Sequence, residues 1–283
     1  MNHSKQEGVY AVWSASILIC MALAAFVLGF TSCKKAEPRP SPSPEPVAQS
    51  ETPESPSGTP ESAPPADDRE SETQPVSGGA TLLGETADMG QEYVDRFVFL
   101  GDSTTYGLGY YGVVGKAQVW TPASGTLTLD RWNTATIVYE DGTELSIVDA
   151  VAKKQPEYLL ITLGVNGISF MEEDYFIEVY TALVQSIVEA GPNTTVILNS
   201  IYPATARYVS QGTGINNEKI TAANGWVERI AEAQGLRYLD SASVLKDEHG
   251  NLPDSLDNGG DGLHMNGEGY EKVIGHLRTH GYQ

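Results

Sequence analysis

The stretch FVFLGDST at residues 97–104 joins a short, wholly apolar run to a glycine, an acid and a hydroxyl side chain. A run of about four to eight apolar residues bounded by turn signals is typical of a strand that is buried on both faces of a sheet. Comparable runs recur further along the chain. We therefore predict buried strands at residues 96–100, 158–163, 195–199 and 236–239.

Helix-forming stretches separate these strands. Apolar residues at helical spacing predict helices at 147–154, 172–190, 217–234 and 267–279, and Gly191-Pro192 ends the second of them. Strands that alternate with helices form crossover units, which give a parallel sheet covered by helices on both faces. Residues 134–147 differ, because two β-prone runs flank Asp141-Gly142 and predict an inserted hairpin or an irregular edge.

The N-terminal end of the chain predicts a membrane segment. Residues 9–32 are almost entirely apolar and uncharged, and a stretch of about 20 such residues can span a bilayer. We interpret residues 1–35 as a signal sequence or a membrane anchor. The tripeptide at 31–33 resembles the end of a lipoprotein signal, in which Cys33 would carry the lipid, although Phe30 stands where Leu is usual. The alternative is an uncleaved span, whose flanking charges alone would place its C-terminal side in the cytoplasm.

A proline-rich spacer follows this segment. Of the 16 prolines, 11 lie between Pro38 and Pro75, among Ser, Glu and Thr. Such a composition buries too little apolar surface to offset the entropy of folding. We predict a disordered linker at 36–85 and one folded domain at 90–283. Because a spacer of this kind typically separates a surface domain from its membrane, we expect an extracytoplasmic location at the cell surface.

Both the spacer and the domain are acidic. The net charge of −20 divides into roughly −7 before Gln91 and roughly −13 after it. A nucleic-acid partner calls for clustered Lys and Arg, whereas in this chain they pair only at 34–35 and 153–154. We therefore do not expect nucleic acid as a partner. Both cysteines, Cys20 and Cys33, precede the domain, so neither a disulfide nor an intramolecular thiol metal site is expected within it.

Candidates for chemistry follow the predicted strands, because ligands of an open parallel sheet bind at the carboxyl ends of its strands. Ser103 follows the first strand, where a helix start would direct N–H groups at a developing negative charge. A serine nucleophile needs a base. Of the five histidines, His264 has the suitable position, with Asp261 three residues earlier to fix its tautomer. Asn166 follows the 158–163 strand, where its amide can donate to an oxyanion.

Three sequence blocks in this order resemble the SGNH (GDSL-like) hydrolases. They are the Gly-Asp-Ser block at 101–103, the Gly-x-Asn block at 164–166 and the Asp-x-x-His block at 261–264, spread over about 170 residues. The resemblance implies a three-layer α/β/α, flavodoxin-like fold with a mostly parallel sheet. It also implies a catalytic triad of Ser103, His264 and Asp261, with no metal and no organic cofactor.

The resemblance further implies an oxyanion hole made of the Ser103 N–H, a glycine N–H and the Asn166 side chain. The glycine block is the weakest match to the family pattern. Gly125, in the sequence TPASG, is our candidate, and Gly112 and Gly115 are its rivals.

Two departures from the family pattern lie beside the matching blocks. Thr104 replaces the usual Leu, and Gly167 replaces the Asp that often follows the block asparagine. Each block alone also has an ordinary structural explanation, since Gly-Asp-Ser suits a turn and Asp261 suits a helix cap. The three blocks together favour catalysis.

The expected activity is that of a serine esterase or deacetylase acting on short acyl esters, with O-acetyl groups on carbohydrate as the substrate class. The aromatic residues Tyr106, Tyr110, Tyr111 and Trp120 follow Ser103 and either line a carbohydrate cleft or serve as packing anchors. An acidic domain repels strongly anionic polymers, which favours neutral glycans. The alternatives are an acyltransferase with the same triad, a lipid or thioester hydrolase, and an inactive surface-binding module.

Overall fold

The computed structural model describes residues 81–283. The predicted membrane segment, Cys33 and the linker up to residue 80 lie outside the described residues. Residues 81–83 run beside strand β7 (Arg237–Leu239): the Leu83 N–H donates to the Tyr238 carbonyl at 2.8 Å, and the Tyr238 N–H donates to the Thr81 carbonyl at 2.8 Å. The folded part therefore begins earlier than residue 90. From residue 81 onward, no helix has the length and apolar character needed to cross a bilayer.

A five-stranded sheet forms the middle layer, and all its strand pairs are parallel, in the order β2-β1-β5-β6-β7. The other strands of this sheet are β1 (Phe97–Gly101), β2 (Val119–Trp120), β5 (Tyr158–Thr162) and β6 (Thr195–Asn199). Side chains of the central strands β1, β5 and β6 are almost all buried, which explains why these strands are continuous apolar runs in the sequence. The predicted parallel sheet is confirmed.

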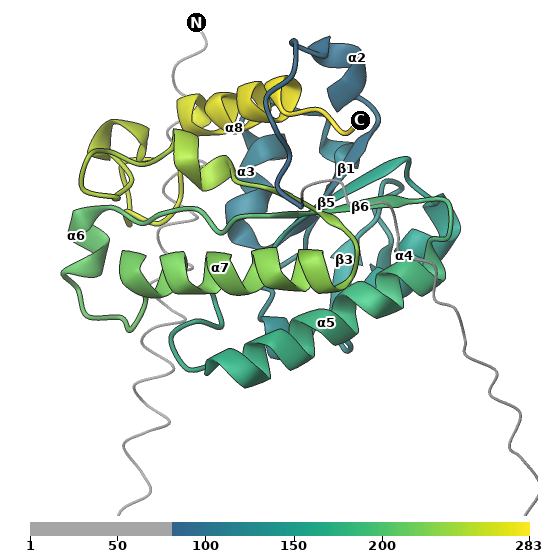
Figure 1. Cartoon of the computed structure of the whole chain (residues 1–283), viewed down its shortest axis with the longest axis horizontal. Coiled ribbons are helices and arrows are strands. Elements are labelled where there is room, and N and C mark those ends of the chain that lie inside the picture. The colour runs from purple at the N-terminus through teal and green to yellow at the C-terminus, as the bar shows by residue number, and fades with distance from the viewer. Residues whose placement is uncertain (1–80) are drawn as a thin grey trace, which may run out of the picture. The chain divides into compact units, whose positions relative to one another are not determined.

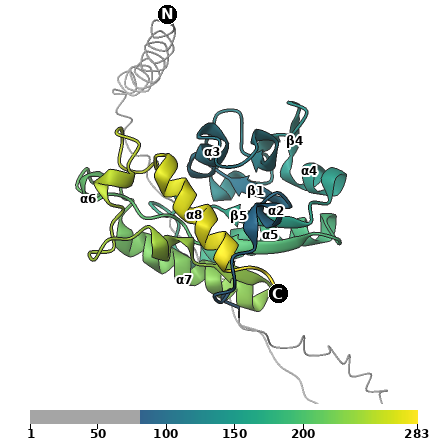
Figure 2. The same ribbon diagram turned by 90° about the horizontal axis from the view of Figure 1, so that it is seen from above.

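Helices cover both faces of this sheet (Figures 1 and 2). One face packs against α4 (Ile147–Lys154), α5 (Glu173–Ala190) and α7 (Asn217–Ala233). The other face packs against α2 (Gly90–Val94), α3 (Ser103–Tyr110) and α8 (Gly267–Thr279). Alternate side chains of β1 point into the two layers, since Val98 belongs to the first core cluster and Phe99 to the second. The three-layer α/β/α architecture is therefore confirmed.

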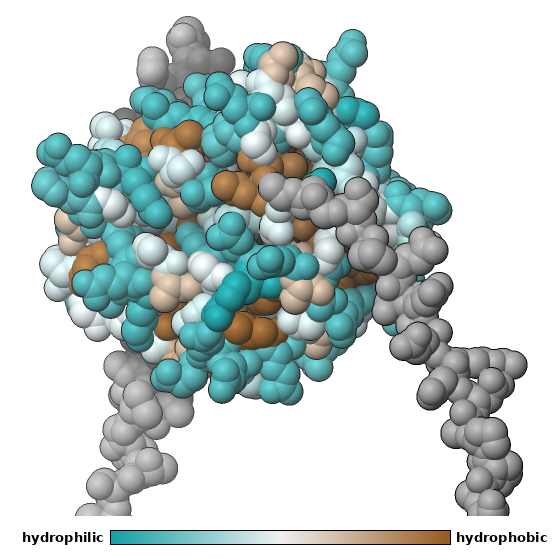
Figure 3. All heavy atoms as spheres, in the orientation of Figure 1, coloured by the Kyte–Doolittle hydropathy of each residue, from teal (hydrophilic) through white to brown (hydrophobic). Residues whose placement is uncertain are grey.

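The remaining elements are short. The predicted hairpin is present as β3 (Thr136–Val138) and β4 (Glu144–Ser146), an antiparallel pair that adjoins α4. One further helix, α6 (Ala206–Val209), lies between β6 and α7. Short 3-10 segments occupy Lys116–Gln118, Leu129–Arg131, Ser241–Val244 and Asp254–Leu256. On the face shown in Figure 3, hydrophilic residues predominate and hydrophobic residues form small separate patches.

Candidate active site

Ser103 is the first residue of α3 and lies just beyond the carboxyl end of β1. The first N–H groups of a helix have no partner inside the helix. Asp102 supplies acceptors for three of them: its carboxylate accepts from the Thr104 N–H at 2.9 Å, and its carbonyl accepts from those of Thr105 and Tyr106 at 2.9 and 3.1 Å. The Ser103 N–H has no such acceptor among the described residues, so it remains available to a ligand at the helix start.

The tight turn into this helix depends on Gly101. A Cβ at Gly101 would lie 2.5 Å from the Thr162 carbonyl oxygen and would overlap the Thr105 side chain. Only glycine leaves room for this close approach of β1, β5 and the first turn of α3. The Gly-Asp-Ser block thus places Ser103 at the edge of the sheet by local packing.

His264 and Asp261 reach Ser103 from a distant part of the chain. The His264 Nε2 atom lies 2.8 Å from the Ser103 Oγ atom, and the His264 Nδ1 atom lies 2.6 Å from the Asp261 Oδ2 atom. The second Asp261 oxygen accepts from the backbone N–H groups of Leu263 at 2.8 Å and His264 at 3.0 Å. The structure therefore brings the three predicted residues into one continuous chain of hydrogen bonds.

The charges of the three hydrogen-bonded side chains determine where their protons lie. Burial by itself would raise the pKa of Asp261, but hydrogen bonds from the His264 ring and from two backbone N–H groups outweigh it and hold that pKa well below its usual range. The hydrogen bond to Asp261 raises the pKa of His264 above its usual value, against the opposing effect of burial. An ionised Asp261 keeps the proton on His264 Nδ1, which leaves Nε2 to accept from the Ser103 hydroxyl.

The loop that carries His264 is fixed by Asp257, a residue that the sequence did not indicate. The Asp257 side chain is 5% exposed and accepts from the Arg207 guanidinium at 2.7 Å and from the Gly262 N–H at 3.0 Å. The Gly262 carbonyl accepts from the Thr205 N–H at 2.8 Å. Arg207 and Thr205 belong to or precede α6, some 50 residues earlier in the chain. No local pattern in the sequence could have revealed this anchor.

Gly125 is the glycine that lies against Ser103. A Cβ built at Gly125 would lie 3.8 Å from the Ser103 Cβ, whereas nothing lies within 4 Å of one built at Gly112, and the nearest atoms to one built at Gly115 belong to Gln118. Gly125 has a φ of +74°, which favours glycine. Its N–H donates to the Pro122 carbonyl at 2.8 Å. The structure thus places Gly125 beside the serine but engages its N–H in a turn.

Asn166 lies at the same edge of the sheet, and both hydrogens of its amide are engaged. The Asn166 Nδ2 atom donates to the Asp102 carboxylate at 3.2 Å and to the Leu127 carbonyl at 3.1 Å. Asp102 is fully buried, and burial raises its pKa to about 6 despite the hydrogen bonds from Thr104. The amide must give up or share one of these bonds before it can donate to an oxyanion. The pairing of Asp102 with Asn166 is a second contact that the sequence did not indicate.

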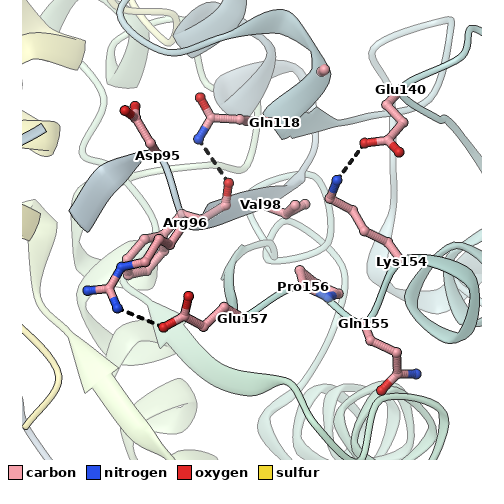
Figure 4. A pocket seen from close by; sticks show the side chains of 11 residues that line it. Asp95, Arg96, Val98, Gln118, Glu140, Lys154, Gln155, Pro156 and Glu157 are labelled. Carbon is pink, nitrogen blue, oxygen red and sulfur yellow. Dashed lines mark hydrogen bonds and ion pairs between the residues drawn. The ribbon is translucent and has the colours of Figure 1, made fainter. Parts of the chain in front are cut away.

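A separate pocket of about 280 Å³ lies near the amino ends of β1 and β5, and Figure 4 shows its lining. Four of its charged side chains form two ion pairs: Arg96 lies 2.7 Å from Glu157, and Lys154 lies 2.5 Å from Glu140. Its lining includes no serine, cysteine or histidine. Ser103 lies at the carboxyl end of β1, so this pocket is at the opposite edge of the sheet from the hydrogen-bonded chain.

A family model and solved structures relate the chain to known proteins. A family model described as the GDSL-like lipase/acylhydrolase family matches residues 99–272, a range that includes Ser103, Asn166, Asp261 and His264. No curated protein matches the chain.

Solved structures resemble the described part of the chain at low sequence identity. A protein from Streptococcus pneumoniae described as a platelet activating factor has a TM-score of 0.51 and 21% identity, over 65% of this chain and 82% of its own. A protein from Bacteroides fragilis described as an acylhydrolase has a TM-score of 0.49 and 20% identity, over 69% of this chain and 88% of its own. A GDSL-like lipase from Bacteroides thetaiotaomicron has a TM-score of 0.47 and 20% identity, over 68% and 88%.

Proposed function

The chain belongs to the GDSL-like lipase/acylhydrolase family, and we propose that it is a serine esterase with Ser103, His264 and Asp261 as its catalytic triad. The observation that carries this proposal is the unbroken series of hydrogen bonds from Ser103 Oγ through the His264 ring to Asp261. Each member has the partner that its role requires: the serine has a base, and the base has a carboxylate that fixes its tautomer.

In the first half of the reaction, the Ser103 Oγ atom forms a bond to the ester carbonyl carbon while His264 Nε2 takes the hydroxyl proton. The carbonyl oxygen becomes an oxyanion, to which the Ser103 N–H donates at the start of α3. Asn166 adds a second donor when its amide shares a hydrogen between Asp102 and the oxyanion. The bond to the leaving alkoxide then breaks, and the alkoxide takes the proton from His264. The product is an alcohol and an acyl group on Ser103.

In the second half, water replaces the alcohol. His264 Nε2 accepts a proton from the water while its oxygen forms a bond to the acyl carbon. The bond from that carbon to Ser103 Oγ then breaks, and the serine recovers the proton from His264. Asp261 stays ionised throughout and stabilises the imidazolium that forms twice in the cycle. One ester and one water thus give one acid and one alcohol.

As the substrate we propose a short acyl ester, with O-acetyl groups on carbohydrate as the preferred class. The domain is acidic, which disfavours strongly anionic polymers and leaves neutral or weakly charged glycans. An acyltransferase would use the same triad and replace the water with a second hydroxyl. A lipid or thioester hydrolase would use it on a longer acyl chain.

The full chain in detergent, assayed on p-nitrophenyl esters from acetate to laurate and on acetylated xylan and acetylated peptidoglycan, tests this proposal. We expect the highest kcat/KM for acetate, release of acetate from a glycan, and no effect of EDTA. A fluorophosphonate should label Ser103 and block all of these activities. A preference for acyl chains of about eight carbons or more, with no acetate released from any glycan, would contradict the substrate class but not the triad.

We also propose that the domain lies outside the cytoplasmic membrane, tethered by a lipid on Cys33 or by the apolar segment at residues 9–32. The support is the sequence of that segment and of the spacer after it. The change Cys33→Ser separates the two tethers. If it removes no lipid label and leaves the protein in the membrane fraction, the lipid tether is wrong and the span remains.

A further inference from the structure

Helix α3, which begins at Ser103, also carries exposed aromatic side chains. Tyr106 and Tyr110 lie within α3 and Tyr111 follows it directly, and their exposed fractions are 48%, 57% and 40%. We refer to these three residues as the tyrosine row. The fourth aromatic residue of this part of the sequence, Trp120, is fully buried and belongs to the core. The row is therefore exposed on the surface, whereas Trp120 is a packing anchor.

The tyrosine row starts beside the proposed nucleophile. Residues three and seven positions apart lie on the same side of a helix, so Tyr106 and Tyr110 share the side of α3 on which Ser103 lies. With about 1.5 Å of rise per residue, they lie about 4.5 and 10.5 Å from Ser103 along the helix axis. A molecule whose ester reaches Ser103 would therefore extend over these rings.

The rings of the row contact one another and pack against Tyr270 of α8, which in turn is bonded to α3. The ring centres of Tyr106 and Tyr110 are 6.0 Å apart, and Tyr110 meets Tyr111 edge-on at 5.0 Å. Tyr111 stacks on Tyr270 at 5.9 Å. The Tyr270 ring is buried, and its hydroxyl donates to the Thr104 carbonyl at 2.7 Å, one residue after the nucleophile. The row is thus an ordered surface whose position is coupled to Ser103.

The other end of the row borders the segment that carries His264. A Cβ built at Gly267, three residues after His264, would lie 3.6 Å from the Tyr111 ring. Gly267 is also the first residue of α8, which packs against α3. The tyrosine row therefore adjoins both segments that meet at the proposed active site.

We propose that the tyrosine row is the subsite for the alcohol side of the ester, and that it binds the face of a neutral sugar ring. This inference rests on the proposed function, since it assigns the sugar of an acetylated glycan to these rings. The π face of an aromatic ring is negative, so it attracts the C–H groups on the face of a sugar, while the phenol hydroxyls can bond sugar hydroxyls. Rings with polar tips suit such a ligand better than they suit an acyl chain.

The charges near the row favour a neutral ligand. Asp261 and Glu268 are exposed acids on the segment that borders Tyr111; Glu268 lies 3.9 Å from the Lys272 ammonium, and Asp261 is ionised at neutral pH. An anionic polymer or an anionic lipid surface would meet repulsion there. The row therefore fits an uncharged glycan and discriminates against acidic ones.

The test is the double change Tyr106→Ala with Tyr110→Ala in the full chain. Each variant is assayed on p-nitrophenyl acetate and on acetylated xylan, which the unchanged enzyme should cleave faster than acetylated peptidoglycan, because peptidoglycan carries carboxylates. We expect kcat/KM on the glycan to fall about tenfold or more, chiefly through KM, while the small ester changes less than about twofold. The matched control is Tyr175→Ala, because Tyr175 is 47% exposed but lies on α5, which packs on the opposite face of the sheet. The control should leave both substrates unaffected.

Further outcomes separate this inference from the proposed function. Unchanged glycan turnover in the double variant would overturn the subsite and leave the esterase intact. Equal losses on both substrates would also overturn it, because the rings would then act on the triad and not on the sugar. Hydrolysis of p-nitrophenyl acetate without any cleavage of glycan by the unchanged enzyme would overturn the substrate class together with the subsite.

Discussion

The two segments that meet at the proposed triad are fixed by different kinds of interaction. Ser103 lies at a regular junction of β1 and α3, where Asp102 and Gly101 supply the hydrogen bonds and the space within a few residues of the serine. His264 lies on an irregular loop, where the anchor is Asp257 and its partner Arg207 comes from α6.

This difference explains which segment tolerates change. The serine side depends on backbone geometry that a strand, a glycine and a helix start create together. The histidine side depends on single side-chain contacts at long sequence distance. We expect substitutions in the loop to move the base without unfolding the domain, and substitutions of Gly101 or Asp102, which shape the start of α3, to affect stability and activity together.

The largest expected effects come from Ser103→Ala and His264→Ala. Each should remove nearly all turnover, because each eliminates one member of the nucleophile and base pair and the two act as a unit. An enzyme with both Ser103→Ala and His264→Ala should be no slower than either single variant, since the two effects do not add. Burst and steady-state kinetics with p-nitrophenyl acetate provide the measurement. Near-normal rates in Ser103→Ala would exclude the mechanism.

The next largest effect should follow Asp261→Asn, with a reduction in kcat of up to about 10⁴-fold, as in serine enzymes whose triad carboxylate is replaced. The pH profile gives a sharper test. Only neutral His264 can act as a base, and its pKa is raised, so kcat/KM of the unchanged enzyme should fall as the pH drops through a value above 6.5. Asp261 is the main cause of the raised pKa of His264. In Asp261→Asn, kcat/KM should therefore begin to fall only at a lower pH than in the unchanged enzyme. An unshifted profile in the variant would show that another group titrates.

Asn166→Ala should lower kcat by about 10²–10³-fold, or about 2.7–4 kcal/mol of barrier, with little change in KM. The physical reason is the loss of a donor to the oxyanion, which exists only in the transition state. The amide also donates to Asp102 and Leu127, so urea unfolding must be measured beside the kinetics. A loss of stability with unchanged kcat would reduce Asn166 to a structural role.

Asp257→Asn tests the histidine side of the comparison directly. It removes the ion pair with Arg207, and a displacement of about 1 Å in a catalytic group can lower the rate about 10²-fold. Since the Asp257 charge also raises the pKa of His264, the acid limb of the pH profile should move to lower pH. The matched control is Asp254→Asn, at an exposed acid on the same loop, which should alter neither the rate nor the acid limb of the pH profile. Equal behaviour of the two variants would refute the anchoring role.

The sequence predicted what local patterns determine. The bounds of β6, α4 and α8 agree with those expected from apolar runs and helix signals, and Ser103 lies at the strand end where it was expected. Strand β2 was missed because it has only two residues, too few for any periodicity. The direction of the Gly125 N–H and the contact of Arg207 with Asp257 were missed because tertiary packing determines them.

The smallest expected effect is on stability alone. It tests whether close packing around α3 outweighs the general preference of helices for alanine over glycine. Alanine is favoured over glycine inside a helix by up to about 1 kcal/mol. At Gly107, however, a Cβ would overlap the buried Tyr270 ring, and overpacking of this kind costs about 1–3 kcal/mol. Gly107→Ala should therefore lower the free energy of unfolding measured in urea. Gly225→Ala, in α7, should raise it, because no atom apart from its chain neighbours and the adjacent backbone of its own helix lies within 4 Å of a Cβ there. Stabilisation by both changes would show that α3 does not depend on its close contact with Tyr270, and the local account of the serine side would then fail.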